Sequence, residues 1–182
     1  MLLLINIIAF QIAWLSSVIG AAQQMPWLGP VVVSFAVALH LKAARKPFDE
    51  ALLVITCGLI GATFDSFLVA AGWVTYPAGL FSDNFAPYWI VTMWMLFATT
   101  LNVSMRWLRG KQKLAALFGF YGGPTSYIAG QALGGILLVN QVAALATLAI
   151  GWAVMMPLLM RLAESLDGMP GSRHNWIAEP NQ

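Results

Sequence analysis

One acidic residue in this sequence lies where an acid is costly, and it is the first candidate for chemistry. Asp65 stands near the middle of an apolar run from Leu52 to Tyr76. An ionisable side chain inside a membrane usually faces the bundle interior or a water-filled cavity. A carboxyl group in that position can donate or accept a proton, so we predict that Asp65 is the catalytic residue. We also expect it to be the only acid in the chain that cannot reach water.

Eight further side chains could complete a site around Asp65. Gln131 falls at a depth similar to that of Asp65, with Tyr127 one helical turn earlier, so Gln131 is the predicted partner. Thr99 and Asn102 share a helical face nearer the cytoplasm and predict a polar cluster there. The predicted substrate-binding residues are Asn6, Gln11, Trp94, Thr99, Asn102, Tyr121, Tyr127 and Gln131. The alternative is that all these polar groups, Asp65 included, only tie helices together.

Several other chemistries are excluded by the motifs that the sequence lacks. It has no histidine pair at zinc-ligand spacing, no Gly-x-Ser-x-Gly elbow and no glycine-rich phosphate loop. Its one cysteine, Cys57, leaves no partner for an internal disulfide. We therefore predict no metal and no cofactor. His40, at the end of an apolar segment, is expected to be a solvated interfacial residue.

The composition indicates the elements that must position these residues. Of 182 residues, 60% are hydrophobic and 9% are charged, whereas about a quarter of the residues in soluble domains carry charge. A helix needs about 20 apolar residues to cross the hydrocarbon core. The sequence thus predicts an all-α membrane protein, a bundle of six transmembrane helices in the lipid bilayer. The six predicted spans are Leu2–Ala21, Trp27–Leu41, Leu52–Trp73, Tyr88–Leu108, Leu114–Leu138 and Val142–Leu162.

The basic residues predict the orientation of this bundle. All nine fall in the loops and ends that a six-span chain with both termini inside would place in the cytoplasm, as the positive-inside rule requires. No other basic face is present, so we predict no nucleic-acid partner. The sequence becomes polar and rich in turn residues from Asp167 onward. We therefore assign residues 1–166 to the bundle and residues 167–182 to a flexible cytoplasmic tail.

Small residues recur every three or four positions along the fifth span. The stripe comprises Ala116, Gly119, Gly123, Ser126, Gly130 and Gly134. Small side chains let another helix approach closely in a membrane. The stripe predicts either packing within the bundle or an oligomer through the Gly119, Gly123, Gly130 and Gly134 face. The adjacent Gly122-Gly123-Pro124 could instead mark a broken helix that lines a cavity.

These features together resemble a known family. The shared features are the early Asn6, Gln11 and Trp14, the mid-span Asp65, Ala86-Pro87-Tyr88-Trp89, Trp94 through Asn102 to Arg106-Trp107, and Tyr121-Gly-Gly-Pro124 with Tyr127 and Gly130. The chain resembles small bacterial inner-membrane proteins grouped as a domain of unknown function, DUF2878. The resemblance implies a multi-pass protein of the bacterial inner membrane. Family members are often encoded near enzymes similar to cyclopropane fatty-acid synthases, which implies work on membrane lipids.

Two functional hypotheses follow, with a structural alternative. The first is an enzyme or accessory subunit that acts on a lipid or another hydrophobic substrate, with Asp65 as proton donor or acceptor. The second is a small proton-coupled transporter in which Asp65 changes protonation as access alternates. The absence of internal repeats, which many transporters contain, favours the first. A membrane scaffold is the alternative if Asp65 is dispensable.

Overall fold

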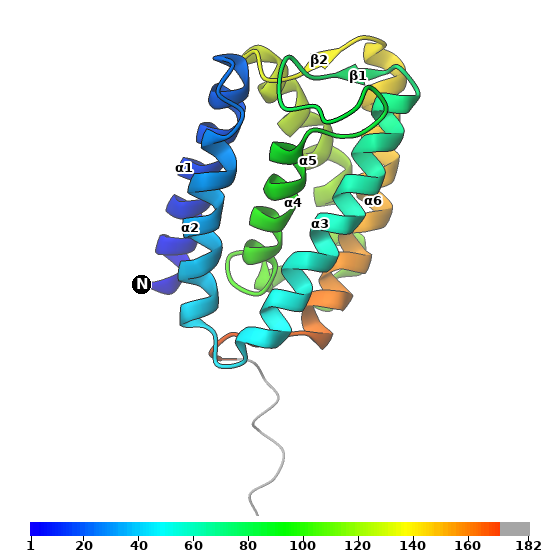
Figure 1. The fold of residues 1–182 in the computed structure, drawn as a ribbon. Helices are drawn as coiled ribbons and strands as arrows, with labels where there is room; N and C mark the ends of the chain where they lie inside the picture. Colours follow the sequence, from blue (N-terminus) through cyan, green and yellow to red (C-terminus); the bar gives the residue numbers. More distant parts are fainter. Residues whose placement is uncertain (172–182) are drawn as a thin grey trace, which may run out of the picture.

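The computed structural model describes residues 1–171, and in them the chain forms a helical bundle (Figure 1). The helices are α1 (Leu2–Ala22), α2 (Leu28–Ala43), α3 (Pro47–Ala70), α4 (Tyr88–Leu101), α5 (Gln112–Ala132) and α6 (Gln141–Ser165). A short 3₁₀ helix, η1 (Arg106–Leu108), lies between α4 and α5. Two short strands, β1 (Val74–Thr75) and β2 (Leu137–Leu138), complete the described structure. The prediction of an all-helical fold is confirmed.

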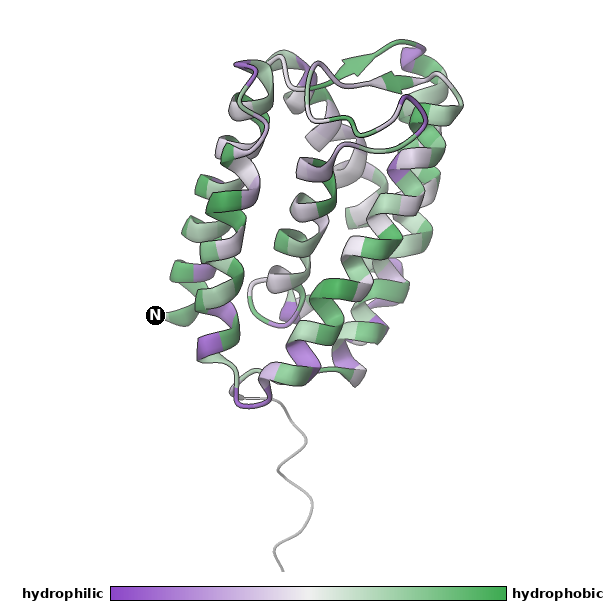
Figure 2. Cartoon of the chain, in the orientation of Figure 1, coloured by the Kyte–Doolittle hydropathy of each residue, from purple (hydrophilic) through white to green (hydrophobic). Residues whose placement is uncertain are grey.

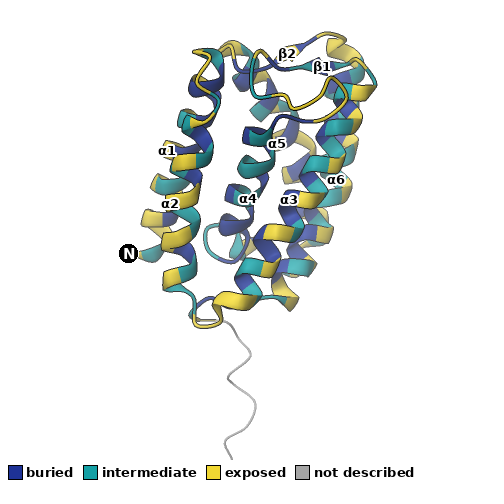
Figure 3. Cartoon of the chain, in the orientation of Figure 1, coloured by how far each residue is buried: buried dark blue, intermediate teal, exposed yellow. Residues whose placement is uncertain are grey.

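Three of the six helices, α1, α3 and α6, are long and apolar enough to cross a membrane, with 21, 24 and 25 residues. Helices α2 and α4 are apolar but shorter. Exposed apolar side chains such as Phe35, Leu59 and Ile150 are 65% to 69% accessible. Figure 2 shows hydrophobic residues along the helices, and Figure 3 shows that many of the outward positions are exposed. Apolar side chains on the outer face suit a lipid environment.

Three predicted spans end earlier as helices than the sequence indicates. The third was expected to reach Trp73, but α3 ends at Ala70. The fourth was expected to reach Leu108, but α4 ends at Leu101 because the amide of Val103 turns back to the carbonyl of Thr100. The fifth was expected to reach Leu138, but α5 ends at Ala132. Gly134 follows with a φ of 83°, the left-handed conformation that glycine commonly supplies after a helix end.

The bundle consists of helix pairs joined at one end by the strands. Helix α1 packs on α2, α3 on α4, and α5 on α6. Strand β1 follows α3 and pairs in antiparallel register with β2, which precedes α6, so that Val74 lies opposite Leu138. The strands lie at the opposite end of the bundle from the α2–α3 turn (Figure 1). They tie the α3–α4 connection to the α5–α6 connection.

The small-residue stripe on α5 packs within the chain. A Cβ atom added at Gly119 would lie 2.2 Å from the carbonyl oxygen of Trp152 on α6, and one at Gly123 would lie 2.4 Å from the Trp152 ring. Gly130 faces Ile136 in the same way, at 2.6 Å. Gly119 and Gly123 let α6 approach α5 closely, and Gly130 makes room for Ile136 in the α5–α6 connection. Gly134 lies beside Ala22, with 3.4 Å between its added Cβ and the alanine methyl group.

Candidate functional site

Asp65 is completely buried and accepts hydrogen bonds from three different elements. Tyr76 Oη, just after β1, donates to Asp65 Oδ1 at 2.9 Å. Trp94 Nε1 on α4 donates to Asp65 Oδ2 at 2.7 Å. Tyr127 Oη on α5 also donates to Oδ1. Both carboxyl oxygens are therefore satisfied within the bundle, as buried polar atoms generally are.

The surroundings of Asp65 are neutral. None of the ion pairs within residues 1–171 includes it, and its three donors are two phenols and an indole. Burial, followed by the charge of the neighbouring carboxylate, raises the pKa of Tyr76 well above its ordinary value. Tyr76 therefore keeps its proton and serves as a donor. A change of charge at Asp65 would disturb no salt bridge in the described residues.

Glycine and a second tryptophan position the Trp94 indole. Gly61 lies one helical turn before Asp65 on α3, and a Cβ atom there would fall 1.9 Å from Trp94 Cγ. On α6, the Trp152 ring stacks on Trp94 with centroids 4.6 Å apart and planes at 13°. Trp152 in turn packs against Gly123. The paired indoles are thus enclosed by Gly61 and Gly123, and this fixes the direction of the Trp94 N–H bond.

An apolar cavity of about 230 Å³ adjoins this arrangement. It is lined by aromatic, methionine and glycine residues together with Ile90 and Ser126, namely Phe10, Trp14, Ile90, Met93, Trp94, Phe97, Met105, Phe118, Gly119, Gly122, Gly123, Ser126, Tyr127, Trp152 and Met156. Trp94 and Tyr127 both line the cavity and donate to Asp65. The carboxyl group itself lies behind this wall and does not line the cavity.

A groove of about 650 Å³ lies alongside the cavity and is lined only by residues of α1 and α5. The two spaces share five wall residues, Phe10, Trp14, Phe118, Gly122 and Ser126. Gln11 and Tyr121 lie on the groove, and Tyr121 is 63% exposed. The cavity therefore adjoins the groove between α1 and α5 through these shared wall residues.

The structure separates the predicted site residues into several places. Trp94 and Tyr127 contact Asp65, whereas Gln131 accepts a hydrogen bond from the amide of Leu138 at 2.8 Å. The predicted contact between Gln131 and Asp65 is therefore absent. Gln11 and Tyr121 line the groove. The remaining three lie elsewhere: Asn6 donates to the carbonyl oxygen of Thr99 at 3.0 Å, and Asn102 joins a second buried acid.

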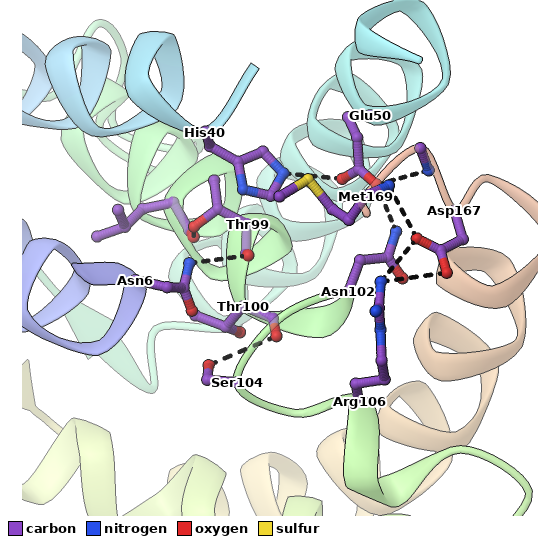
Figure 4. Close-up of polar contacts among 12 residues, drawn as sticks. Asn6, His40, Glu50, Thr99, Thr100, Asn102, Ser104, Arg106, Asp167 and Met169 are labelled. Atoms are coloured by element: carbon purple, nitrogen blue, oxygen red, sulfur yellow. Dashed lines mark hydrogen bonds and ion pairs between the residues drawn. The ribbon is translucent and has the colours of Figure 1, made fainter. Parts of the chain in front are cut away.

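That second acid is Glu50, which sequence reasoning missed. Its side chain is completely buried, so the expectation that only Asp65 is shielded from water is wrong. Glu50 Oε2 lies 2.8 Å from His40 Nε2, and Oε1 accepts from Asn102 Nδ2 and the Gly168 amide, both at 2.8 Å (Figure 4). His40 is 6% exposed, so it is buried and paired, not solvated as expected. The sequence signal that could have predicted this pair is the short α2–α3 turn, which lies between His40 and Glu50.

The Glu50 cluster extends toward the end of the described chain. Arg109 donates to Asn102 Oδ1 and, through Nη1, to Asp167 Oδ2 at 2.7 Å. Asp167 also accepts from Arg106 at 3.0 Å, and the amides of Arg45 and Lys46 donate to the Gly168 carbonyl oxygen. Residues 167–171, at the start of the predicted tail, therefore lie against the bundle. The rest of that tail lies outside the described residues.

The described residues 1–171 contain no cluster of three histidine, cysteine or acidic side chains that could hold a metal ion. The buried polar groups instead form two separate networks, one around Asp65 beside the apolar cavity and one around Glu50 at the end with the α2–α3 turn. The arrangement at Asp65 can move a proton between a buried carboxyl group and a phenol that faces an apolar space. The arrangement at Glu50 links helices and turns through charged groups.

The fold and the Asp65 site define a helical membrane protein with a buried acid beside an apolar cavity. A family described as "Protein of unknown function (DUF2878)" matches residues 3–158, and the chain belongs to that family. The resemblance noted from the sequence is thus confirmed. The matched region extends from α1 through most of α6 and includes Asp65 and its three donors. No curated protein and no solved structure matches the chain.

Proposed function

We propose that the chain is an enzyme, or an accessory subunit of one, that acts on a membrane lipid or another hydrophobic substrate. The observation that carries this proposal is that two residues of the cavity wall are hydrogen-bonded to the acid. Trp94 and Tyr127 line the apolar cavity and both donate hydrogen bonds to Asp65. A hydrophobic molecule in the cavity would lie one side chain away from a buried carboxyl group. The lipid work implied by the family resemblance agrees with this assignment.

Tyr127 is the group through which Asp65 would act. Tyr127 lines the cavity, and its phenol donates a hydrogen bond to the carboxyl oxygen Oδ1. In the proposed reaction the phenol passes its proton to the substrate and recovers one from the Asp65 carboxylic acid, or the transfers run in reverse. Positioned proton donors and acceptors of this kind are general acid–base catalysts. Trp94 holds the other carboxyl oxygen in place.

The groove between α1 and α5 would supply the entry route. It shares five wall residues with the cavity and runs between α5 and the apolar helix α1. An acyl chain from the surrounding bilayer could enter sideways without crossing water. Gln11, Thr125 and Tyr121 line this groove and offer polar contacts to a substrate that enters there.

We also infer six spans in the bacterial inner membrane, with both termini in the cytoplasm. Six helices lie side by side in one bundle (Figure 1), and basic residues from separate loops gather at one end. The positive-inside rule places that end in the cytoplasm. Reporter fusions at Lys46, Lys111 and the carboxyl end should report cytoplasm, and fusions at Ser82 and Asn140 the outer side. A cytoplasmic signal at Ser82 would be incompatible with six spans.

Gly122 offers a way to fill the cavity without disturbing the helix packing. A Cβ atom added there meets only the Phe118 ring, at 3.9 Å, whereas one at Gly123 would overlap Trp152. The probe is a phospholipid that carries a photoreactive diazirine on its acyl chain. We expect it to label cavity residues in the parent protein and to lose most of this labelling in Gly122→Phe.

Ile150→Phe is the matched control, because Ile150 is exposed on α6 and lines neither the cavity nor the groove. It should label like the parent. Unchanged labelling of cavity residues in Gly122→Phe would contradict a lipid in the cavity. Lipid profiling of a strain that lacks the natural copy then tests the reaction. An unchanged lipid composition in that strain would count against lipid chemistry and favour the transporter or the scaffold.

A further inference from the structure

A second large pocket, of about 800 Å³, lies at the opposite end of the bundle from the strands. The α2–α3 turn, the segment around η1 and the end of α6 form its walls. Its charged lining comprises five basic residues, Arg45, Lys46, Arg106, Arg109 and Lys111, and three acidic ones, Asp49, Glu164 and Asp167. The lining thus carries an excess of positive charge, which is the sign that an anion requires.

Two of the arginines, Arg106 and Arg109, are fixed in place by the Glu50 cluster, and Figure 4 shows Arg106 beside Asp167. Asp167 accepts from Arg106 at 3.0 Å and from Arg109 at 2.7 Å, and its side chain is 6% exposed. Arg109 is also held by Asn102, which donates in turn to Glu50 at 2.8 Å. These bonds order the floor of the pocket before any ligand arrives, and such preorganisation reduces the entropic cost of binding.

Two other basic side chains of the pocket, Arg45 and Lys111, have no carboxylate partner among the described residues. Within residues 1–171, neither Arg45 nor Lys111 takes part in an ion pair, and Lys46 reaches only Asp49, at 4.0 Å. Arg45 and Lys111 are both exposed at the pocket. They enter from separate turns, one before α3 and one before α5. An anion between these turns would meet two unneutralised positive charges.

Trp107 indicates the depth at which this pocket lies. Its ring is 51% exposed, lines the pocket, and has Lys111 Nζ 5.9 Å from its centroid. Tryptophan is enriched at the level of the lipid head groups. Basic clusters at that level recognise anionic head groups. The depth therefore favours a phosphate that is carried by a lipid.

We propose that this pocket binds a phosphate group. Arg45 and Lys111 contact the phosphate directly, and the fixed Arg106 and Arg109 contribute positive electrostatic potential. An anionic phospholipid head group and a free phosphate share the chemistry that the pocket recognises. This site is separate from the Asp65 cavity: the two have no lining residue in common. The proposal consequently does not depend on the reaction proposed above.

The test measures thermal unfolding of the full-length protein in neutral detergent. The probes are short-chain phosphatidylglycerol, short-chain phosphatidylcholine, and inorganic phosphate against sodium chloride of equal ionic strength. A ligand that binds only the folded state stabilises it by RT ln(1 + L/Kd), where L is the free ligand concentration, so Tm rises with ligand concentration and the dependence gives the affinity. We expect phosphatidylglycerol to raise the Tm of the parent protein, and phosphatidylcholine to raise it much less.

The double variant Arg45→Gln/Lys111→Gln should bind phosphatidylglycerol about 30-fold more weakly, because each basic residue near the head groups contributes about fivefold in affinity. Lys113→Gln is the matched control, since Lys113 is exposed in the same turn but lies outside the pocket lining. It should bind like the parent. If the double variant folds poorly, each single variant should show a weakening of about fivefold.

The outcomes separate the two sources of phosphate. Stabilisation by phosphatidylglycerol alone identifies a lipid head group, and stabilisation by inorganic phosphate as well identifies a general phosphate site. Equal affinity of the parent and the Arg45 and Lys111 variants would overturn the proposal. So would equal stabilisation by the two lipids, or no stabilisation of the parent by any of the three probes.

Discussion

Asp65 and Glu50 are both completely buried, but their surroundings differ in charge. Asp65 accepts hydrogen bonds from two phenols and an indole, all of them neutral. Two of these donors line the apolar cavity. Glu50 is hydrogen-bonded to His40, Asn102 and a backbone amide. The cluster around it also includes charged side chains. One acid can change its charge without breaking an ion pair. The other connects several elements that would separate without it.

This contrast shows that burial alone does not identify a functional acid. A buried carboxylate within a network of charged partners is a structural link, and removal of one partner usually destabilises the protein strongly. A buried carboxylate with neutral donors, beside a space large enough for a ligand, is a better candidate for proton chemistry. The variants below test whether the two acids really differ in this way.

The largest effect should come from Glu50→Ala. It leaves His40, Asn102 and the Gly168 amide without their acceptor, and each buried donor left unsatisfied costs about 1–3 kcal/mol. Thermal unfolding in detergent measures the loss. Asp49→Ala is the control, because Asp49 pairs only with an exposed lysine at 4.0 Å and should cost less than about 1 kcal/mol. Equal stability of the two variants would contradict a structural role for Glu50.

A smaller loss of stability, with a complete loss of function, is expected for Asp65→Asn. The amide oxygen can still accept from Tyr76 and Tyr127, but the amide nitrogen then faces the Trp94 N–H group. An unsatisfied buried donor costs about 1–3 kcal/mol. The variant should still insert yet fail to complement a strain that lacks the natural copy. Full complementation would rule out proton transfer at Asp65 and leave only a packing role.

The smallest loss of stability is expected for two variants that each remove a phenol from the same carboxyl oxygen of Asp65. Tyr127→Phe and Tyr76→Phe each remove one hydrogen bond to Asp65, and each should cost about 1 kcal/mol. Only Tyr127 lines the cavity. Complementation should therefore fail for Tyr127→Phe and persist for Tyr76→Phe. The same phenotype in both variants would show that the cavity wall has no special role.

Helical periodicity was sufficient to predict part of the candidate site. Asp65, Trp94 and Tyr127 lie on helices whose inward faces can be derived from the sequence, and they do meet. Tyr76 was not assigned to the site, because it lies beyond the end of α3. Gly72, with a φ of 70°, turns the chain there, and the phenol returns to Asp65. Such a return depends on the turn and has no periodic signal.

The errors at Glu50 and His40 have a different physical origin. Hydropathy places both near the end of an apolar segment, where water is expected. They are buried because residues far away in the sequence cover them: Gly168 contacts Glu50, and Met169 beside it is 1% exposed. The span-length helices α1, α3 and α6 were predictable from composition. The cover over the Glu50 cluster comes from tertiary packing, which composition does not reveal.

The contact between Glu50 and Gly168 also bears on how the protein is made. The three groups that satisfy Glu50 leave the ribosome in the order His40, Asn102 and Gly168. Asp167, which holds Arg106 and Arg109, arrives just before the last of them. The α2–α3 turn therefore cannot reach its final hydrogen bonding until Gly168 has been synthesised. Assembly of this end of the bundle follows the synthesis of α6, and a chain that stops after α6 would leave it unfinished.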